Sequence, residues 1–205
     1  MPRTAKPGFT LIEVAVVLVI VIALGAGAAY EYRSNKDATT TPTVAATADP
    51  TAGWQTFSST AGGYTVKYPK GWFTTASLAD ATTEIKNGTS IAFSDKEFVN
   101  PLQPADGGQY ISIDLIQSDL SLDDYVTTTF QSSDEPGTLS DQVASTVDGN
   151  PALKVTFTGS GSLAGQNSHS FFVKTSKGIV QMVYPITTST DMTSTFDKMA
   201  STLTF

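Results

Sequence analysis

The sequence predicts an α+β protein with an N-terminal transmembrane helix, a disordered linker and an antiparallel β-sheet head flanked by helices. Three observations predict this class. Residues 14–30 form an uncharged, mostly apolar run; residues 34–53 are rich in Thr, Ala and Pro and contain no aromatic side chain; and the rest of the chain alternates apolar with polar residues between turn sequences. The predicted parts are a basic leader, the apolar helix, the linker and the head, at residues 1–8, 9–33, 34–53 and 54–205.

A distinctive motif lies at the start of the apolar run. Residues Gly8–Glu13 read Gly-Phe-Thr-Leu-Ile-Glu, which resembles the N-terminus of type IV pilins and of the pseudopilins of type II secretion. In that family a prepilin peptidase cuts after the glycine and methylates the new N-terminal residue. The resemblance implies cleavage between Gly8 and Phe9 and N-methylation of Phe9. It also implies three partners: the prepilin peptidase, the membrane, and other pilin subunits contacted through the N-terminal helix.

Glu13 is the acidic residue of this motif, and an acidic residue at the end of a membrane helix is costly. Cleavage after Gly8 would expose an α-amino group with a pKa of about 7.7–8.0 in water. Carried into a bundle of apolar helices, that ammonium would need a neutralising partner. The resemblance implies that Glu13 of a neighbouring subunit supplies it, so Glu13 is the predicted subunit-assembly residue.

Two other interpretations of the N-terminus stay open. The first is a secretory signal peptide with Ala26-Gly27-Ala28 as its cleavage site. The second is an uncleaved signal anchor, since a helix over Phe9–Tyr30 would be about 33 Å long at 1.5 Å per residue, enough to span a bilayer. All three interpretations place the head outside the cytoplasm, because Arg3 and Lys6 precede the apolar run.

Composition narrows the classes of function. The chain has 205 residues, a formal net charge of −7 and no cysteine. A chain this acidic is a poor ligand for nucleic acid, so no nucleic-acid partner is expected. Without cysteine the head has no disulfide and must hold together by its core alone.

The linker separates this chain from the usual pilin pattern. Residues 34–53 cannot bury enough apolar surface to offset the entropy lost on ordering. Pilins usually continue the membrane helix into an amphipathic half that packs on the head, and residues 39–50 show no such stripe. The head is therefore expected to be tethered to the helix rather than fused to it. Ser/Thr-rich sequence with Pro also resembles O-glycosylated stalks.

The predicted strands of the head follow from alternating apolar residues and from turn residues. Tyr64–Tyr68 and Tyr110–Gln117 each alternate apolar with polar residues. Three hairpins are predicted where Gly-containing turns separate two such runs. The turns Asn87-Gly88, Asp148-Gly149-Asn150 and Lys177-Gly178 join residues 83–86 to 89–94, 143–147 to 152–158, and 168–175 to 179–184, respectively.

Two helices are predicted in the head. Leu122–Phe130 follows Ser121, whose hydroxyl can cap the helix with Asp124 in the manner of a capping box. Asp191–Ser201 places Met192, Phe196 and Met199 on one face at helical spacing. Because helices lie between and after the strands rather than alternating strictly with them, the head is expected to be an α+β sandwich.

The order of these elements resembles the PsbP-like (Mog1/PsbP) fold. The resemblance covers most of the head, but its motifs are mainly core positions, so it implies a PsbP-like α/β sandwich and not an activity. The motifs are Tyr64-x-Val66-x-Tyr68-Pro69-x-x-Trp72, Asp148-Gly149-Asn150-x-Ala152, and Phe196-x-x-Met199-x-Ser201-Thr202-Leu203-x-Phe205.

No residue pattern in the head predicts catalysis, metal binding or a cofactor. The single histidine, His169, has no local motif for a nucleophile and an orienting carboxylate. The glycine-rich residues 159–165 lack the Lys-Ser/Thr ending of a phosphate loop. The acidic residues within 119–124 lack the glycine and the glutamate spacing of a calcium loop.

The sequence leaves the ligand of the head unspecified. Trp54, Trp72 and Phe73 either line a ligand groove or pack in the core, and packing is the favoured interpretation. The overall expectation is a non-catalytic, membrane-anchored minor pilin or pseudopilin of a bacterial type IV pilus or type II secretion-like system, acting by assembly or display. The alternative is a tethered extracytoplasmic binding module that uses the pilin-type signal only for export and anchoring.

Overall fold

The computed structural model describes residues 49–205, except 102, 106, 131–136 and 187–190. The predicted leader, the predicted transmembrane helix and most of the predicted linker lie outside the described residues. Within the described part of the chain, no helix combines the length and the apolar character that crossing a membrane requires.

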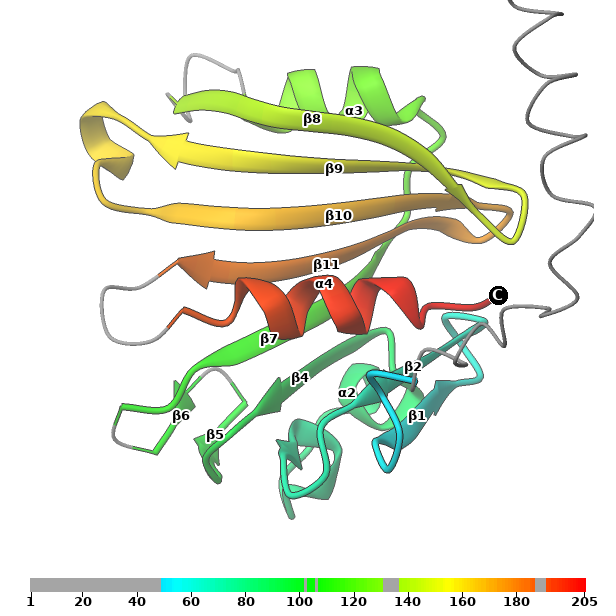
Figure 1. The fold of residues 1–205 in the computed structure, drawn as a ribbon, viewed down its shortest axis with the longest axis vertical. Coiled ribbons are helices and arrows are strands. Elements are labelled where there is room, and N and C mark those ends of the chain that lie inside the picture. The colour runs from blue at the N-terminus through cyan, green and yellow to red at the C-terminus, as the bar shows by residue number, and fades with distance from the viewer. Residues whose placement is uncertain (1–48, 102, 106, 131–136, 187–190) are drawn as a thin grey trace, which may run out of the picture. The chain divides into compact units, whose positions relative to one another are not determined.

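A seven-stranded antiparallel sheet forms the centre of the head (Figure 1). Its strands, in spatial order, are β3 (Phe73–Thr74), β4 (Ser90–Ser94), β7 (Tyr110–Ile116), β11 (Gly178–Ile186), β10 (Asn167–Thr175), β9 (Asn150–Gly159) and β8 (Gly137–Val147). The predicted antiparallel sheet with few helices is confirmed. Two small two-stranded sheets accompany it, β1 (Gln55–Ser59) with β2 (Tyr64–Tyr68), and β5 (Phe98–Asn100) with β6 (Gln103–Pro104).

A helix packs on each face of the large sheet. Helix α4 (Thr193–Ser201) lies against β11 (Figure 1). Its Phe196 side chain is completely buried. Helix α3 (Leu122–Phe130) packs on β8, β9 and β10. Side chains alternate along a strand, so neighbouring residues of β10 point to opposite faces of the sheet. Phe171 packs in the core under α4, which we call the α4-side core, and Phe172 packs in the core under α3, the α3-side core. The head therefore has a hydrophobic core on both faces of its sheet.

The strand predicted at Tyr64–Tyr68 is β2, but it pairs with β1 instead of entering the large sheet. Tyr64 and Val66 are buried in the α4-side core. Thr65 exchanges backbone hydrogen bonds with Thr204 (2.9 and 3.1 Å), which joins the small sheet to the end of the chain. The β1–β2 sheet thus closes one end of the α4-side core.

The predicted hairpin at Asn87-Gly88 is wrong, because Thr83–Asn87 forms a short helix, α2. The Thr82 hydroxyl accepts a hydrogen bond from the Ile85 amide (3.4 Å) at its start. Gly88 ends the helix at φ 71°, and its amide donates to the Ile85 carbonyl (3.0 Å). A type I′ turn needs positive φ at both central residues, whereas only Gly88 has it here. The same Asn-Gly pair therefore serves as a helix C-terminus.

The predicted Asp148-Gly149 turn and the cap of α3 match the structure closely, whereas the third turn lies at Ser176-Lys177, one residue before the predicted Lys177-Gly178. Asp148 (φ 49°) and Gly149 (φ 79°) both have positive φ, as a type I′ hairpin between β8 and β9 requires. Helix α3 has the predicted bounds, and the Ser121 hydroxyl accepts from the Asp124 amide (3.1 Å). Helix α4 begins at Thr193 instead of Asp191, while Met192 is buried as predicted.

The folded head includes residues that the sequence assigned to the end of the linker. Thr51 is buried, and its amide and hydroxyl both donate to the Asp49 carboxylate (2.8 and 2.7 Å). The Trp54 amide donates to the Thr51 carbonyl (3.0 Å). Residues 49–53 therefore form a hydrogen-bonded turn that leads into β1.

Candidate functional site

The residues to which the sequence assigns a function, namely Gly8, Phe9 and Glu13, lie outside the described residues. Cleavage, methylation and subunit assembly therefore stay predictions. The candidate site described by the structure lies in the head.

His169 lies on β10, packed against the α4-side core. Its ring centroid is 6.1 Å from that of Tyr184 and 6.2 Å from that of Phe196. Its Nδ1 lies 3.0 Å from the Thr156 hydroxyl oxygen on β9. These contacts hold the imidazole in one orientation on the sheet.

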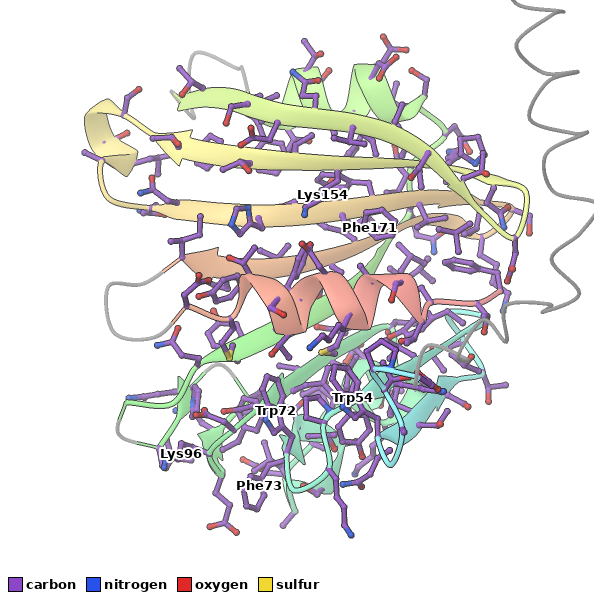
Figure 2. All side chains as sticks on the ribbon, in the orientation of Figure 1. Trp54, Trp72, Phe73, Lys96, Lys154 and Phe171 are labelled. Carbon is purple, nitrogen blue, oxygen red and sulfur yellow. The ribbon has the colours of Figure 1, made fainter. Side chains whose placement is uncertain are left out.

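The three aromatic residues considered for a ligand groove, Trp54, Trp72 and Phe73, differ in how deeply they are buried. Trp54 and Trp72 are partly buried and pack against the α4-side core, which agrees with the packing interpretation (Figure 2). Phe73 is 39% exposed at the start of β3, an edge strand. The glycine-rich residues 159–165 connect β9 to β10 through a short 3-10 turn, as the predicted hairpin loop requires.

A recess of about 400 Å³ lies beside strands β4 and β7, and we call it the Asp114 recess. Its lining combines hydroxyls, two carboxylates and a few apolar side chains. The lining residues are Thr75, Thr82, Glu84, Ile85, Ser90, Ile91, Ala92, Pro101, Tyr110, Ser112 and Asp114. A volume of this size is in the range of pockets that hold small molecules, about 300–1,000 Å³.

The register of two neighbouring strands builds the polar side of the recess. On β7, Ser112 and Asp114 alternate with the buried residues Ile111 and Ile113, so they point to the opposite face. Ser90 of β4 pairs with Asp114, and Ala92 pairs with Ser112. The Ser90 hydroxyl donates to the Asp114 Oδ1 atom at 2.6 Å. The sheet thus fixes a carboxylate and its hydroxyl partner side by side.

Helix α2 and the residues before it form another wall. Ile85 of α2 is buried in the α4-side core, which anchors the helix against β4. The Thr75 hydroxyl accepts from the Ala92 amide (3.1 Å), at a point of β4 that β3 does not cover. Glu84, on the exposed side of α2, borders the recess. The end of helix α2 at Gly88, where the sequence predicted a hairpin turn, therefore matters for the site, because it sets where α2 meets β4.

The pKa values of the two carboxyl groups of the recess, Asp114 and Glu84, shift in opposite directions. Burial raises the pKa of Asp114, and hydrogen bonds from the Ser90 and Ser112 hydroxyls partly oppose this rise. Hydrogen bonds from its own backbone amide and from Thr82 lower the pKa of Glu84. Burial also raises the pKa of the Tyr64 hydroxyl, with a further contribution from the charge on Asp114. Asp114 is therefore a carboxylate held partly out of water, a setting common at functional sites.

A second, larger groove of about 530 Å³ lies between the β8–β9 hairpin, α4 and the end of the chain. Figure 2 shows Lys154 and Phe171, which line it, on the sheet beside α4. Lys154 forms an ion pair with Asp197, and the Asp148 carboxylate accepts from the Phe205 amide (2.8 Å). Lys154 and Asp197 neutralise each other within the head, whereas the groups that bond the Asp114 carboxylate are uncharged hydroxyls, so we place the candidate site at the Asp114 recess.

Sequence reasoning missed the Asp114 recess, although one signal was present. The alternation of the strand at 110–117 puts Ile111 and Ile113 on one side, and Ser112 and Asp114 on the other. Aspartate is depleted in strands, so Asp114 in the middle of an apolar strand was a clue. Its pairing with Ser90, however, depends on how β4 and β7 align.

Comparison with known proteins gives only distant likenesses. No protein-family model matches the chain, and no curated protein matches it in sequence. Among solved structures, the chain is similar to the solution structure of cyanobacterial PsbP (CyanoP) from Synechocystis sp. PCC 6803, with 19% identity and a TM-score of 0.45 over 73% of this chain and 90% of that chain.

The chain is also similar to a crystal structure from Bacteroides thetaiotaomicron VPI-5482, with 12% identity and a TM-score of 0.40 over 73% of this chain. It spans about half, 47%, of that second chain. CyanoP belongs to the family that the sequence motifs resemble.

Proposed function

We propose that this chain is a tethered extracytoplasmic binding module. The apolar N-terminal segment anchors it in the membrane, the linker spaces the head from the bilayer, and the head takes up a ligand in the Asp114 recess. It acts by binding, without catalysis and without a cofactor. The observation that carries this proposal is the partly buried Asp114 carboxylate in a recess of about 400 Å³.

Physical cost supports a functional role for Asp114. Moving a charged carboxylate out of water is unfavourable unless partners compensate. Here the Ser90 hydroxyl donates to the carboxylate (2.6 Å), with a further contribution from the Ser112 hydroxyl. An uncharged residue at this position would avoid the cost, and natural proteins keep such costs mainly where function needs them.

The N-terminal sequence supports the tethered placement. Arg3 and Lys6 favour a cytoplasmic N-terminus, so the head would lie on the other side of the membrane. A prepilin peptidase would cut between Gly8 and Phe9 and methylate Phe9. In this proposal the motif serves export and anchoring only.

Cell fractionation tests the placement. Cells that carry filaments are sheared, and the chain is followed by immunoblot in the sheared filaments and in the membrane pellet. A tethered module stays in the pellet, and protease added to spheroplasts digests its head. Recovery of the chain with the sheared filaments would overturn the tethered-module proposal.

A minor pilin or pseudopilin is the second candidate, and the Gly8–Glu13 motif favours it. The two candidates differ in what Glu13 does. For a tethered module, Glu13→Ala should leave the chain in the membrane, and insertion should improve because an acidic residue costs up to about 2.5–3.5 kcal/mol in a membrane helix. For a pilin, the variant should be exported and cleaved but absent from filaments that contain the wild-type chain.

A further inference from the structure

We propose that the Asp114 recess binds a small protonated amine, with the Asp114 carboxylate as its counter-ion. This inference rests on the proposed function, because it names the class of ligand that the binding module takes. It follows from the charge of the lining, from the direction of its hydrogen bonds and from the position of its apolar side chains.

The charge of the recess selects a cation. Its lining includes the carboxylates of Asp114 and Glu84, and none of its lining residues is basic. An anionic ligand would meet like charges and lose its hydration without compensation, which selects against it. An ammonium group beside Asp114 would gain a charge-assisted hydrogen bond in a partly dry setting, where such bonds are strongest.

Asp114 and its partner Ser90 can both accept hydrogen bonds from a ligand. The Ser90 hydroxyl directs its proton to Asp114 Oδ1 (2.6 Å), so the lone pairs of the serine oxygen remain available to accept. Carboxylates accept hydrogen bonds, and an ammonium group has three donors and no acceptor. A primary amine in its protonated form therefore complements this polar side.

Part of the lining suits a hydrocarbon body. Ala92 and Pro101 line the recess beside its polar groups, and Ile85 and Ile91, whose side chains pack mainly in the α4-side core, lie at its border. The volume of about 400 Å³ fits a small molecule rather than a bare ion. In the described part of the chain, no three acidic, histidine or cysteine residues are grouped to hold a metal ion. An amine with a short carbon chain satisfies both the polar and the apolar parts.

Isothermal titration calorimetry of the full chain in detergent micelles tests the inference. The probes are n-butylammonium chloride, 1-butanol and sodium butyrate, which share a four-carbon chain and carry positive, zero and negative charge. The wild-type chain should bind butylammonium and show at least about tenfold weaker binding of butanol and of butyrate, the discrimination expected of a charge-assisted contact.

Variants then locate the binding. Asp114→Asn keeps the size of the side chain and removes its charge, so affinity for butylammonium should fall at least about tenfold. Asp141→Asn makes the same charge change on β8, at the far edge of the sheet from β4, and should leave affinity unchanged. If Asp114→Asn fails to melt cooperatively, Glu84→Gln on the exposed side of α2 replaces it, with a smaller loss expected.

The outcomes separate this inference from the proposed function. Equal binding of butanol and butylammonium, with both weakened by Asp114→Asn, would overturn the amine as ligand while supporting the recess as a binding site. Binding of butylammonium that both recess variants leave intact would overturn the site. Absence of binding by all three probes would overturn the amine inference, whereas the tethered placement depends on the fractionation result.

Discussion

The carbonyl of Gly88 offers a sharp energetic test of how α2 is held against the small sheet. It accepts hydrogen bonds from the Tyr64 hydroxyl (3.0 Å) and from the Ser59 hydroxyl (2.8 Å), and both bonds are buried. We predict that removing both donors costs more than the sum of the two single removals. The variants are Tyr64→Phe, Ser59→Ala and the two combined.

The expected magnitudes follow from what each change leaves behind. Tyr64→Phe leaves the Gly88 carbonyl bonded to Ser59, so the loss should be about 0.5–1.5 kcal/mol, the usual net value of one hydrogen bond. Ser59→Ala also removes the partner of the Gly62 amide (2.8 Å), so its cost should be higher, about 1–3 kcal/mol. The double variant leaves the carbonyl without either donor, which should add about 1 kcal/mol to the sum.

Urea unfolding of the full chain in detergent, followed by tryptophan fluorescence, measures these free energies, and the m-value should stay constant. A control cycle combines Tyr64→Phe with Ser121→Ala, which removes the cap of α3. Those two costs should add within about 0.3–0.5 kcal/mol, as for distant sites. Equally additive costs for Tyr64 and Ser59 would refute the shared carbonyl and, with it, the way α2 is anchored.

Three further predictions concern the core, the site and the second groove. Phe196→Ala removes a fully buried ring packed beside Tyr184, so urea unfolding should show a loss of about 3–5 kcal/mol; a loss below about 1 kcal/mol would contradict the placement of α4. Because the folded-state pKa of Asp114 is raised, its charge destabilises the fold at neutral pH and this cost disappears as the pH falls through that pKa. Asp114→Asn should therefore raise the melting temperature at pH 7, and this gain should shrink on acidification. A gain in melting temperature that grows as the pH falls would contradict a raised pKa for Asp114. Lys154→Met breaks a half-exposed ion pair with Asp197 and should cost at most about 1 kcal/mol in the same unfolding assay.

Local sequence signals predicted the parts of the fold that local physics determines. Helix α3 needed only a serine cap and a short amphipathic stretch, and its bounds were correct. The Asp148-Gly149 turn followed from the need for positive φ at two successive residues. Alternation identified β2 and β7, whose buried residues alternate with less buried ones.

The failures have physical causes as well. Gly88 can supply positive φ to a hairpin or to a helix end, and the choice depends on Ile85 being buried against the core. Strand β8 begins at Gly137, whereas the predicted strand begins at Val143. The prediction missed the first residues because a bulge, with Asp141 at φ 51°, interrupts the alternation along the strand. Local pattern reading cannot find strand residues on the far side of a bulge.

The candidate site was beyond local prediction because it is assembled across the sheet. Ser90 and Asp114 lie 24 residues apart and meet only through the register of β4 and β7. Thr75 joins them by bonding a β4 amide that β3 leaves open. The sequence could show that Asp114 was unusual in a strand, but not what it would face.

The proposed anchoring of the head depends on how the N-terminus is processed, and the intact mass of the mature chain from its native cells measures this most directly. A tethered module exported through the pilin-type signal should begin at Phe9 and carry one added methyl group at its N-terminus. A chain that retains Met1–Gly8, or one that begins at Ala29 after signal-peptide cleavage, would contradict the proposed anchoring.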